Sequence, residues 1–151
     1  MGDVLKSAYL RAKAVDYLQH FIGLPYLWGG DDPIAGFDCS GLIVEVLQAV
    51  GLLNHGTDYS AAMLYKKFED GAVTQAYGGC LVFWYKDDEI IHVEMMIDDF
   101  HTVGASGGGS TTTTIGEAIR ANAFIKMRPL SYRGPYYLIS DPFKNTSAEV
   151  P

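Results

Sequence analysis

The sequence is poor in cysteine, in positive charge and in long apolar runs. Two cysteines among 151 residues could form one disulfide at most. Lysine and arginine number 11 against 18 acidic residues, and no basic patch stands out, so we expect no nucleic-acid partner. No apolar run approaches the length of a membrane span, and the first six residues lack the apolar segment of a signal peptide. We therefore expect no membrane partner.

Metal-ligand spacing is also missing. The histidines and cysteines do not recur at the intervals of zinc sites, and the paired aspartates lack the pattern of a calcium loop. We expect no metal and no cofactor. An apolar fraction of 48% and an aromatic fraction of 13% are typical of a globular enzyme of this length. We predict a single domain over residues 1–143, followed by a polar tail over residues 144–151.

Cys39 lies where a glycine-rich turn meets a predicted helix. The apolar residues that follow have helical spacing: Leu42, Ile43, Val46, Leu47 and Val50. Asp38 is well placed as the N-cap of that helix. Because backbone N–H groups and the helix dipole favour a thiolate there, the sequence predicts a cysteine nucleophile. The alternative is a buried structural cysteine, which the Gly29-Gly30 turn and the acidic cap disfavour.

Among the four histidines, His92 is the best candidate for the catalytic base. It opens a strand-like run over residues 90–97, and residues 81–85 form another, so the two runs predict a hairpin. A histidine at the start of a strand is held rigidly near a sheet edge, where the N-terminus of a helix can meet it. We expect His20 to lie on a solvated helix and His55 in a surface loop.

Three stretches of the chain resemble the NlpC-type cysteine peptidases. They are GLPYLWGG at residues 23–30, FDCSGL at residues 37–42 and GCLVFW at residues 79–84. The resemblance implies an α+β fold with a papain-like core, in which the helix of the nucleophile packs on an antiparallel sheet that carries the base. It also implies the site residues: Cys39 as nucleophile, His92 as base, and Tyr26, Asp38 and Ser40 as supporting or oxyanion-binding neighbours.

The activity implied by the resemblance is hydrolysis of the stem peptides of bacterial peptidoglycan. The expected bond joins γ-D-glutamate to a diamino acid and is cleaved through a Cys39 thioester. An amidase or a transpeptidase could use the same pair of residues, and a non-catalytic wall-binding or phage tail module could retain the same fold. Without a leader, such an enzyme would stay in the cytoplasm until lysis or travel on a phage particle, consistent with phage or prophage origin. If a leader has been removed, the enzyme is extracellular.

The chain departs from the family pattern at the third polar residue. The family usually has a histidine there, within a His-Ala-Ser-like string, whereas this chain has Gly104, which has no side chain to orient His92. Glu94 and His101 are possible substitutes, as is a backbone carbonyl or a water molecule. We favour the carbonyl or the water over Glu94, and Glu94 over His101. A second departure is Cys80, where the family normally has aspartate.

The periodicity and turn signals predict the remaining elements. Helices are expected over residues 4–22, 39–50, 60–68 and 115–122, and strands over residues 80–85, 90–97, 101–105 and 124–130. Thr114 and Glu117 have the spacing of a capping box. Residues 107–114, rich in glycine and threonine, are expected to form a flexible connection.

Overall fold

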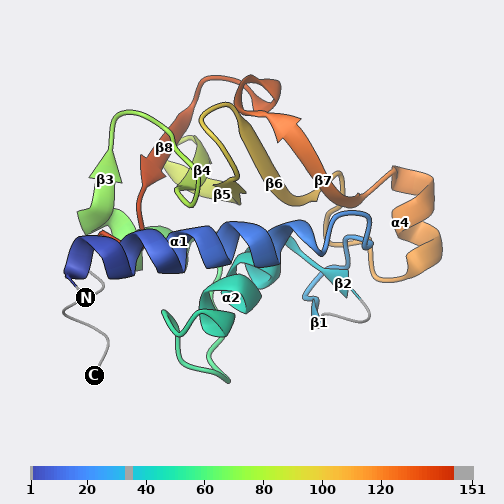
Figure 1. The fold of residues 1–151 in the computed structure, drawn as a ribbon. Coiled ribbons are helices and arrows are strands. Elements are labelled where there is room, and N and C mark those ends of the chain that lie inside the picture. The colour runs from blue at the N-terminus through green and yellow to red at the C-terminus, as the bar shows by residue number, and fades with distance from the viewer. Residues whose placement is uncertain (1, 33–35, 145–151) are drawn as a thin grey trace.

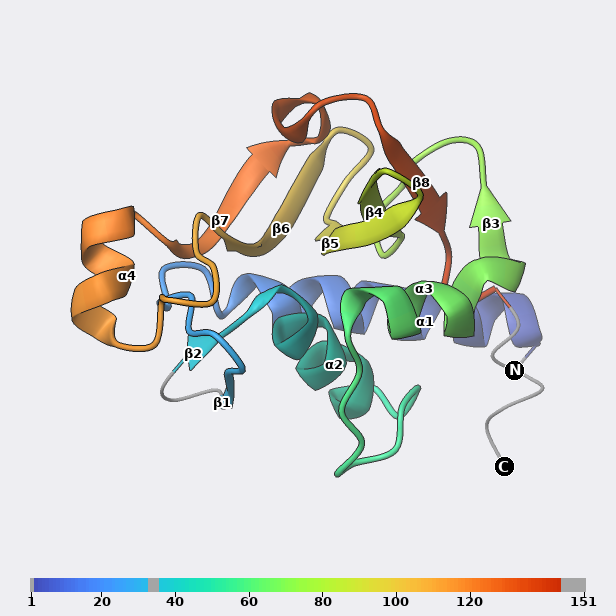
Figure 2. The ribbon, with the colours of Figure 1, turned by 180° about the vertical axis from the view of Figure 1, so that it is seen from behind.

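In the computed structural model, which describes residues 2–32 and 36–144, helices pack beneath an antiparallel sheet (Figure 1). Helix α1 (Asp3–Gln19) runs along the base of the sheet, and α2 (Cys39–Ala49) lies beside it. Seen from behind, α3 (Ala61–Phe68) covers the same side (Figure 2). The α+β architecture expected from the sequence is confirmed, with the helix that begins at Cys39 packed on the sheet.

The sheet has six strands in the described part of the chain, in the order β3-β8-β4-β5-β6-β7, and every neighbouring pair is antiparallel. The strands are β3 (Ala72–Val73), β4 (Leu81–Lys86), β5 (Glu89–Met96), β6 (His101–Ser106), β7 (Phe124–Pro129) and β8 (Tyr137–Ser140). Two further short strands, β1 (Asp31–Asp32) and β2 (Gly36–Phe37), pair just before α2. The hairpin predicted around His92 is β4–β5.

Alternate residues of β4 and β5 face two different apolar clusters. Leu81, Phe83, Val93 and Met95 belong to the main core beneath the sheet, together with α1 and α2. Val82, Trp84 and Met96 belong to a smaller cluster on the opposite face. His92 and Glu94 alternate with the core residues of β5, so they share the face of this smaller cluster.

A partly buried ion pair joins α1 to Asp141, the residue that follows β8. The Arg11 guanidinium lies 2.6 Å from the Asp141 carboxylate, which also accepts a 2.7 Å hydrogen bond from the Tyr77 hydroxyl. Cys80 lies close to this group and is fully buried, and burial raises the pKa of its thiol to about 11. Cys80 therefore stays a neutral thiol, and both cysteines are free.

The expected helices and strands are present, with boundaries that differ from the expected ones by at most three residues. A short helix α4 (Ile115–Ala121) begins at the predicted cap, where Thr114 accepts a hydrogen bond from the Glu117 backbone N–H. Strand β8 was missed because its four residues are too few for a clear alternation, and the two-residue strands β1, β2 and β3 were missed for the same reason. The 3-10 helices η1 (Glu69–Gly71) and η2 (Leu130–Arg133) were also missed. The predicted polar tail lies outside the described residues except for Lys144, and the single-domain boundary stays a prediction.

Within the described residues, no helix combines the length and apolar composition needed to cross a membrane.

Candidate active site

Asp38 fixes the start of α2 and with it the position of Cys39. One carboxylate oxygen accepts a 2.7 Å hydrogen bond from the Gly41 N–H, and the other accepts a 3.0 Å bond from the Gly29 N–H. Asp38 therefore caps the helix and ties it to the preceding loop at the same time. Burial raises the pKa of Asp38 above its ordinary value of 3.8, while these backbone donors oppose that rise.

The glycines of the motif allow the loop and the helix to approach closely. A Cβ built on Gly41 would overlap the carbonyl oxygen of Gly30, and a Cβ built on Gly30 would lie 2.8 Å from the carbonyl oxygens of Leu27 and Gly36. Gly29 has a φ of +72°, in the left-handed region that favours glycine. The Gly-Gly turn is therefore a steric requirement for placing Cys39 at the start of the helix.

His92 faces the Cys39 thiol from β5. Its ring is buried, and burial by itself disfavours the protonated form. Hydrogen bonds to Cys39 and Glu94, together with their negative charges, outweigh burial and raise the pKa of His92 above its ordinary 6.5. Cys39 and His92 are thus brought together as the sequence predicted, and the surroundings of the ring favour the protonated imidazolium.

The second nitrogen of His92 is bonded to Glu94. The His92 Nε2 atom lies 2.7 Å from the Glu94 Oε2, and the Thr102 hydroxyl donates a 2.6 Å hydrogen bond to Oε1. Hydrogen bonds from the His92 ring and from Thr102 keep the pKa of Glu94 below its ordinary 4.5, although burial acts in the opposite direction. Since Nε2 is taken by Glu94, Nδ1 is the nitrogen left to face Cys39.

Glu94 occupies the space that a side chain at position 104 would need. Met95 pairs with Val103 and Met96 with Thr102, so the same register continued by one residue sets Glu94 opposite Gly104. A Cβ built on Gly104 would overlap the Glu94 Cγ and lie 2.6 Å from its Cδ. The glutamate and the glycine are therefore complementary: a large residue on β5 fills the room left on β6.

The contact between His92 and Glu94 shows that we ranked the substitutes for the third polar residue of the site in the wrong order. We favoured a backbone carbonyl or a water molecule, but the partner of the His92 ring is Glu94. Strand geometry sets side chains two residues apart well away from each other, and for this reason we ranked Glu94 below a carbonyl or a water molecule. The missing side chain of Gly104 lets Glu94 lean along the strand toward His92, and the Thr102 hydroxyl holds it there.

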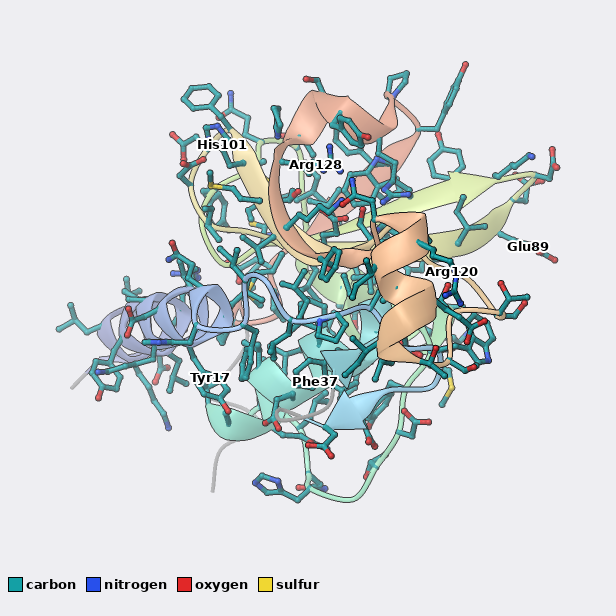
Figure 3. All side chains as sticks on the ribbon, turned by 90° about the vertical axis from the view of Figure 1, so that its right-hand side faces the viewer. Tyr17, Phe37, Glu89, His101, Arg120 and Arg128 are labelled. Atoms are coloured by element: carbon teal, nitrogen blue, oxygen red, sulfur yellow. The ribbon has the colours of Figure 1, made fainter. Side chains whose placement is uncertain are left out.

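His101 lies elsewhere. Its Nδ1 faces the Asp98 carboxylate at 3.0 Å in the exposed turn between β5 and β6. Figure 3 shows His101 at the outer end of the sheet, well away from Phe37, which directly precedes the Asp38 cap. The structure therefore separates His101 from Cys39 and His92.

Tyr26 and Ser40 flank the cysteine. Burial and the negative charges of Cys39 and Asp38 raise the pKa of Tyr26 to about 12, so its hydroxyl remains a donor at neutral pH. Ser40 lies beside the Asp38 carboxylate, with its hydroxyl 3.5 Å from Oδ1. The ring of Tyr26 packs against Gly108, where a Cβ would lie 2.6 Å from the Cε1 atom.

The glycine- and threonine-rich segment packs against the Tyr26 loop. The Trp28 N–H donates a 2.7 Å hydrogen bond to the Thr112 carbonyl, and the buried Thr112 hydroxyl accepts one from the Gly109 N–H. The segment that we expected to be a flexible connection therefore forms one wall of the site.

Cys39 and His92 open into a cleft of about 550 Å³. The walls come from the Tyr26 loop, the start of α2, the segment before α3, the strand β5 around His92, residues 105–109 and Arg133. Among the described residues, no cluster of three or more histidine, cysteine, aspartate or glutamate side chains could hold a metal ion. The cleft thus presents a thiol, an imidazole and donor groups of the chain itself.

A comparison with family models matches residues 23–128 to the NlpC/P60 family. The matched segment includes the capped helix, His92, Glu94 and Gly104. The chain belongs to the NlpC/P60 family.

Two curated relatives that the chain matches carry endopeptidase names. The chain is 31% identical over 90 residues to the bifunctional muramidase/DL-endopeptidase CwlT of Bacillus subtilis, covering 58% of this chain and 26% of CwlT. It is 57% identical over 45 residues to the murein DD-endopeptidase MepH of Escherichia coli, covering 28% of this chain and 17% of MepH. The chain matches only 9–26% of the length of such curated relatives.

Solved structures of the family share the fold. An NlpC/P60 family protein from Bacillus cereus superimposes with a TM-score of 0.67 at 22% identity, over 86% of this chain and 39% of that one. At this identity the likeness concerns the fold alone.

Sequence reasoning missed three residues around the His92–Glu94 pair: Thr102, Trp84 and Arg133. The Trp84 ring lies 5.6 Å from the His92 ring, and the Arg133 guanidinium lies 5.6 Å from the Trp84 ring and 3.6 Å from the Glu94 carboxylate. Thr102 could have been found from its strand position, since it lies two residues before Gly104 and faces the same side. No local sequence pattern predicts that Arg133 lies near His92, because it belongs to the short helix η2, which follows β7.

Proposed function

We propose that this protein is a cysteine peptidase that hydrolyses the stem peptides of bacterial peptidoglycan. The observation that carries the proposal is the arrangement of Cys39, His92 and Glu94: a thiol at the capped start of a helix faces an imidazole whose other nitrogen is bonded to a carboxylate. Membership of the NlpC/P60 family and the endopeptidase names of its relatives support the substrate class.

In the proposed reaction the Cys39 thiolate attacks the carbonyl carbon of the scissile amide. His92 gives its proton to the leaving amine, so that a thioester to Cys39 remains and the first product departs. His92 then takes a proton from a water molecule, which attacks the thioester and releases the acid product with the cysteine restored. The raised pKa of His92 supports the protonated form that the first step needs.

The oxyanion of each tetrahedral intermediate would be bound by the Cys39 backbone N–H and the Tyr26 hydroxyl. The N–H belongs to the first residue of α2, where the helix leaves its donors free, and the high pKa of Tyr26 keeps its O–H as a donor. Such a donor contributes about 3–4 kcal/mol to an acyl-transfer transition state. Asp38 and Ser40 support the site by fixing the helix start.

Glu94 is proposed as the positioning residue of the site, in the place of the side chain that Gly104 lacks. A carboxylate bonded to Nε2 holds the imidazole in one tautomer and one orientation and stabilises its protonated form. The glycine at position 104, where the family usually has a histidine, is an argument for a non-catalytic wall-binding or phage tail module. The Glu94 contact weakens that argument, because the orienting group is supplied from the neighbouring strand.

The bond that we propose joins γ-D-glutamate to a diamino acid. The name of CwlT refers to a DL bond, whereas the name of MepH refers to a DD bond. Amidase or transpeptidase chemistry at the same cysteine would yield different products. Product analysis is therefore the decisive measurement.

The test is digestion of purified peptidoglycan, with fragments identified by mass spectrometry. We expect the wild type to release fragments cut after γ-D-glutamate, and Cys39→Ala to release none. His101→Ala is the matched control, since it removes a histidine outside the cleft and should leave the products unchanged.

Three results would count against the proposal. Equal digestion by the wild type and Cys39→Ala would exclude a Cys39 nucleophile. Intact stem peptides freed from the glycan would indicate an amidase. Binding to peptidoglycan without any cleavage by the wild type would favour the non-catalytic module.

A further inference from the structure

Arg133 lies beside the catalytic pair and is open to the cleft. It ends the short helix η2 between β7 and β8, outside the segment that matches the family model. One of its terminal nitrogens lies 3.6 Å from the Glu94 carboxylate, which is longer than a hydrogen bond, and about a third of its side chain (32%) is exposed. The guanidinium is thus held near Glu94 while part of it faces the cleft.

Trp84 limits the positions that Arg133 can take. The guanidinium lies 5.6 Å from the centre of the Trp84 ring, within the range of a cation–π contact, and the same ring lies 5.6 Å from the ring of His92. Trp84 itself is buried. Arg133 is therefore a charge anchored next to His92, and a planar donor of this kind suits a carboxylate.

Apart from the His92 imidazolium, the remaining charges of the cleft are negative. Among the described residues that line it, Arg133 is the single lysine or arginine, whereas Asp31, Asp38 and Asp58 supply carboxylates. The chain as a whole has a net charge of −7. An anionic group of a substrate would be repelled by the aspartates and attracted to the side of the cleft that holds Arg133 and His92.

The chemistry of the proposed reaction indicates which part of the substrate lies next to Arg133. His92 must reach the leaving amine to protonate it, so the residue that carries this amine lies on the His92 side of Cys39. Arg133 is on that same side, because it contacts the carboxylate bonded to His92 Nε2. The Arg133 guanidinium is therefore next to the diamino acid, which carries the leaving amine and departs as the first product.

We propose that Arg133 binds a carboxylate on the side chain of the leaving diamino acid, so that the site prefers diaminopimelate to lysine. The two residues differ in this position by one carboxylate, which diaminopimelate has and lysine lacks. The inference rests on the proposed peptidase function and names its preferred substrate class.

The test compares two tripeptides, L-Ala-γ-D-Glu-meso-diaminopimelate and L-Ala-γ-D-Glu-L-Lys, cleaved by the wild type, Arg133→Gln and Arg128→Gln. Arg128 is the matched control, because it stacks on Tyr132 at 3.9 Å and does not line the cleft. We expect the wild type to show kcat/KM about tenfold to a hundredfold higher for the diaminopimelate peptide, the range of a charge-assisted contact. Arg133→Gln should lower that value to the level of the lysine peptide, mostly through KM, and Arg128→Gln should change neither.

Three results would overturn the role of Arg133 while leaving the peptidase intact. An equal fall for both peptides would mean that Arg133 acts only through Glu94 and His92. An unchanged preference in Arg133→Gln would mean that another group recognises the carboxylate, and a wild type without preference would contradict the proposal directly.

A binding measurement separates this inference from the peptidase function itself. Calorimetric titration of Cys39→Ala and Cys39→Ala/Arg133→Gln with the same two peptides needs no catalysis. Tighter binding of the diaminopimelate peptide that disappears with Arg133 would support the inference even if the wild type cleaved neither peptide. Equal binding of both peptides, or binding of neither, would refute it.

Discussion

The two walls of the cleft are built in different ways. The Cys39 wall is a continuous stretch of chain, from the Tyr26 loop to the first turn of α2, held by backbone groups, glycines and the Asp38 cap. The His92 wall is assembled from β4, β5, β6 and η2, and its contacts join side chains of separate elements. The first wall is local in sequence and the second is not.

The difference shows which features of the site can vary. On the Cys39 wall, glycines allow backbone atoms to touch, so a change at one position has few possible compensations. On the His92 wall, a carboxylate reaches the imidazole from β5 because β6 has a glycine opposite it. We therefore expect that a side chain on β6 could make the same contact if β5 left room for it.

On the His92 wall, Glu94→Ala is expected to have the largest effect on activity, because it removes the carboxylate that contacts His92. Removing the carboxylate frees the imidazole and leaves Thr102 and Arg133 without their partner, so we expect kcat to fall about 10²–10⁴-fold with a smaller change in KM. Glu94→Gln keeps an acceptor of the same length and should retain more activity than Glu94→Ala. Steady-state kinetics on a stem tripeptide, with circular dichroism to check folding, measure both. A fully active, folded Glu94→Ala would show that orientation is supplied by another group.

On the Cys39 wall, Gly41→Ala is expected to lower the free energy of unfolding by about 1–3 kcal/mol. The added methyl group would overlap the Gly30 carbonyl and push the loop away from the helix. Gly116→Ala in α4 is the control, because the nearest atom to its Cβ would be 3.6 Å away and alanine is the better helix former. Urea denaturation compares the two variants. Equal stability of Gly41→Ala and the wild type would contradict the close approach described above.

The next prediction tests whether the orienting group can be moved from Glu94 on β5 to position 104 on β6. A histidine at position 104 clashes with Glu94, so we expect Gly104→His by itself to lose activity. In Glu94→Ala/Gly104→His the clash is gone, and the new imidazole could orient His92 from β6. We expect this double variant to be about tenfold or more faster than Glu94→Ala. If the double variant is no faster than Glu94→Ala, the two positions are not interchangeable.

The smallest effect concerns pH and stability. The pKa of His92 is raised, so its stabilising contribution is complete below about pH 6.5 and is lost as pH rises through the folded-state pKa. The pKa of Glu94 is lowered, so its contribution is present above about pH 4.5 and is lost as pH falls through the folded-state value. The stability gap between the wild type and Glu94→Gln should therefore be widest between about pH 4.5 and 6.5. Each unit of pKa difference corresponds to about 1.4 kcal/mol. A gap that is flat with pH in urea denaturation would mean that the pair is not ionised as described.

Much of the Cys39 wall could be predicted because its contacts are close in sequence. The apolar spacing after Cys39 gave the helix, and an aspartate directly before it gave the cap. The hairpin that carries His92 was also predictable, from two strand-like runs and a short turn. Strand β8 was not, since its place between β3 and β4 depends on a chain reversal more than 30 residues after β5.

The sequence by itself determined the helix that begins at Cys39 and the hairpin that carries His92, because local periodicity and capping fix short elements. Only the tertiary structure decided which group orients His92 and which charge lies beside it. Glu94 reaches the imidazole because strand pairing sets it opposite a glycine, and Arg133 joins it because η2 returns over Trp84. Side-chain contacts between strands depend on the pairing register and on the space left by the neighbouring strand, and local sequence patterns predict neither of them.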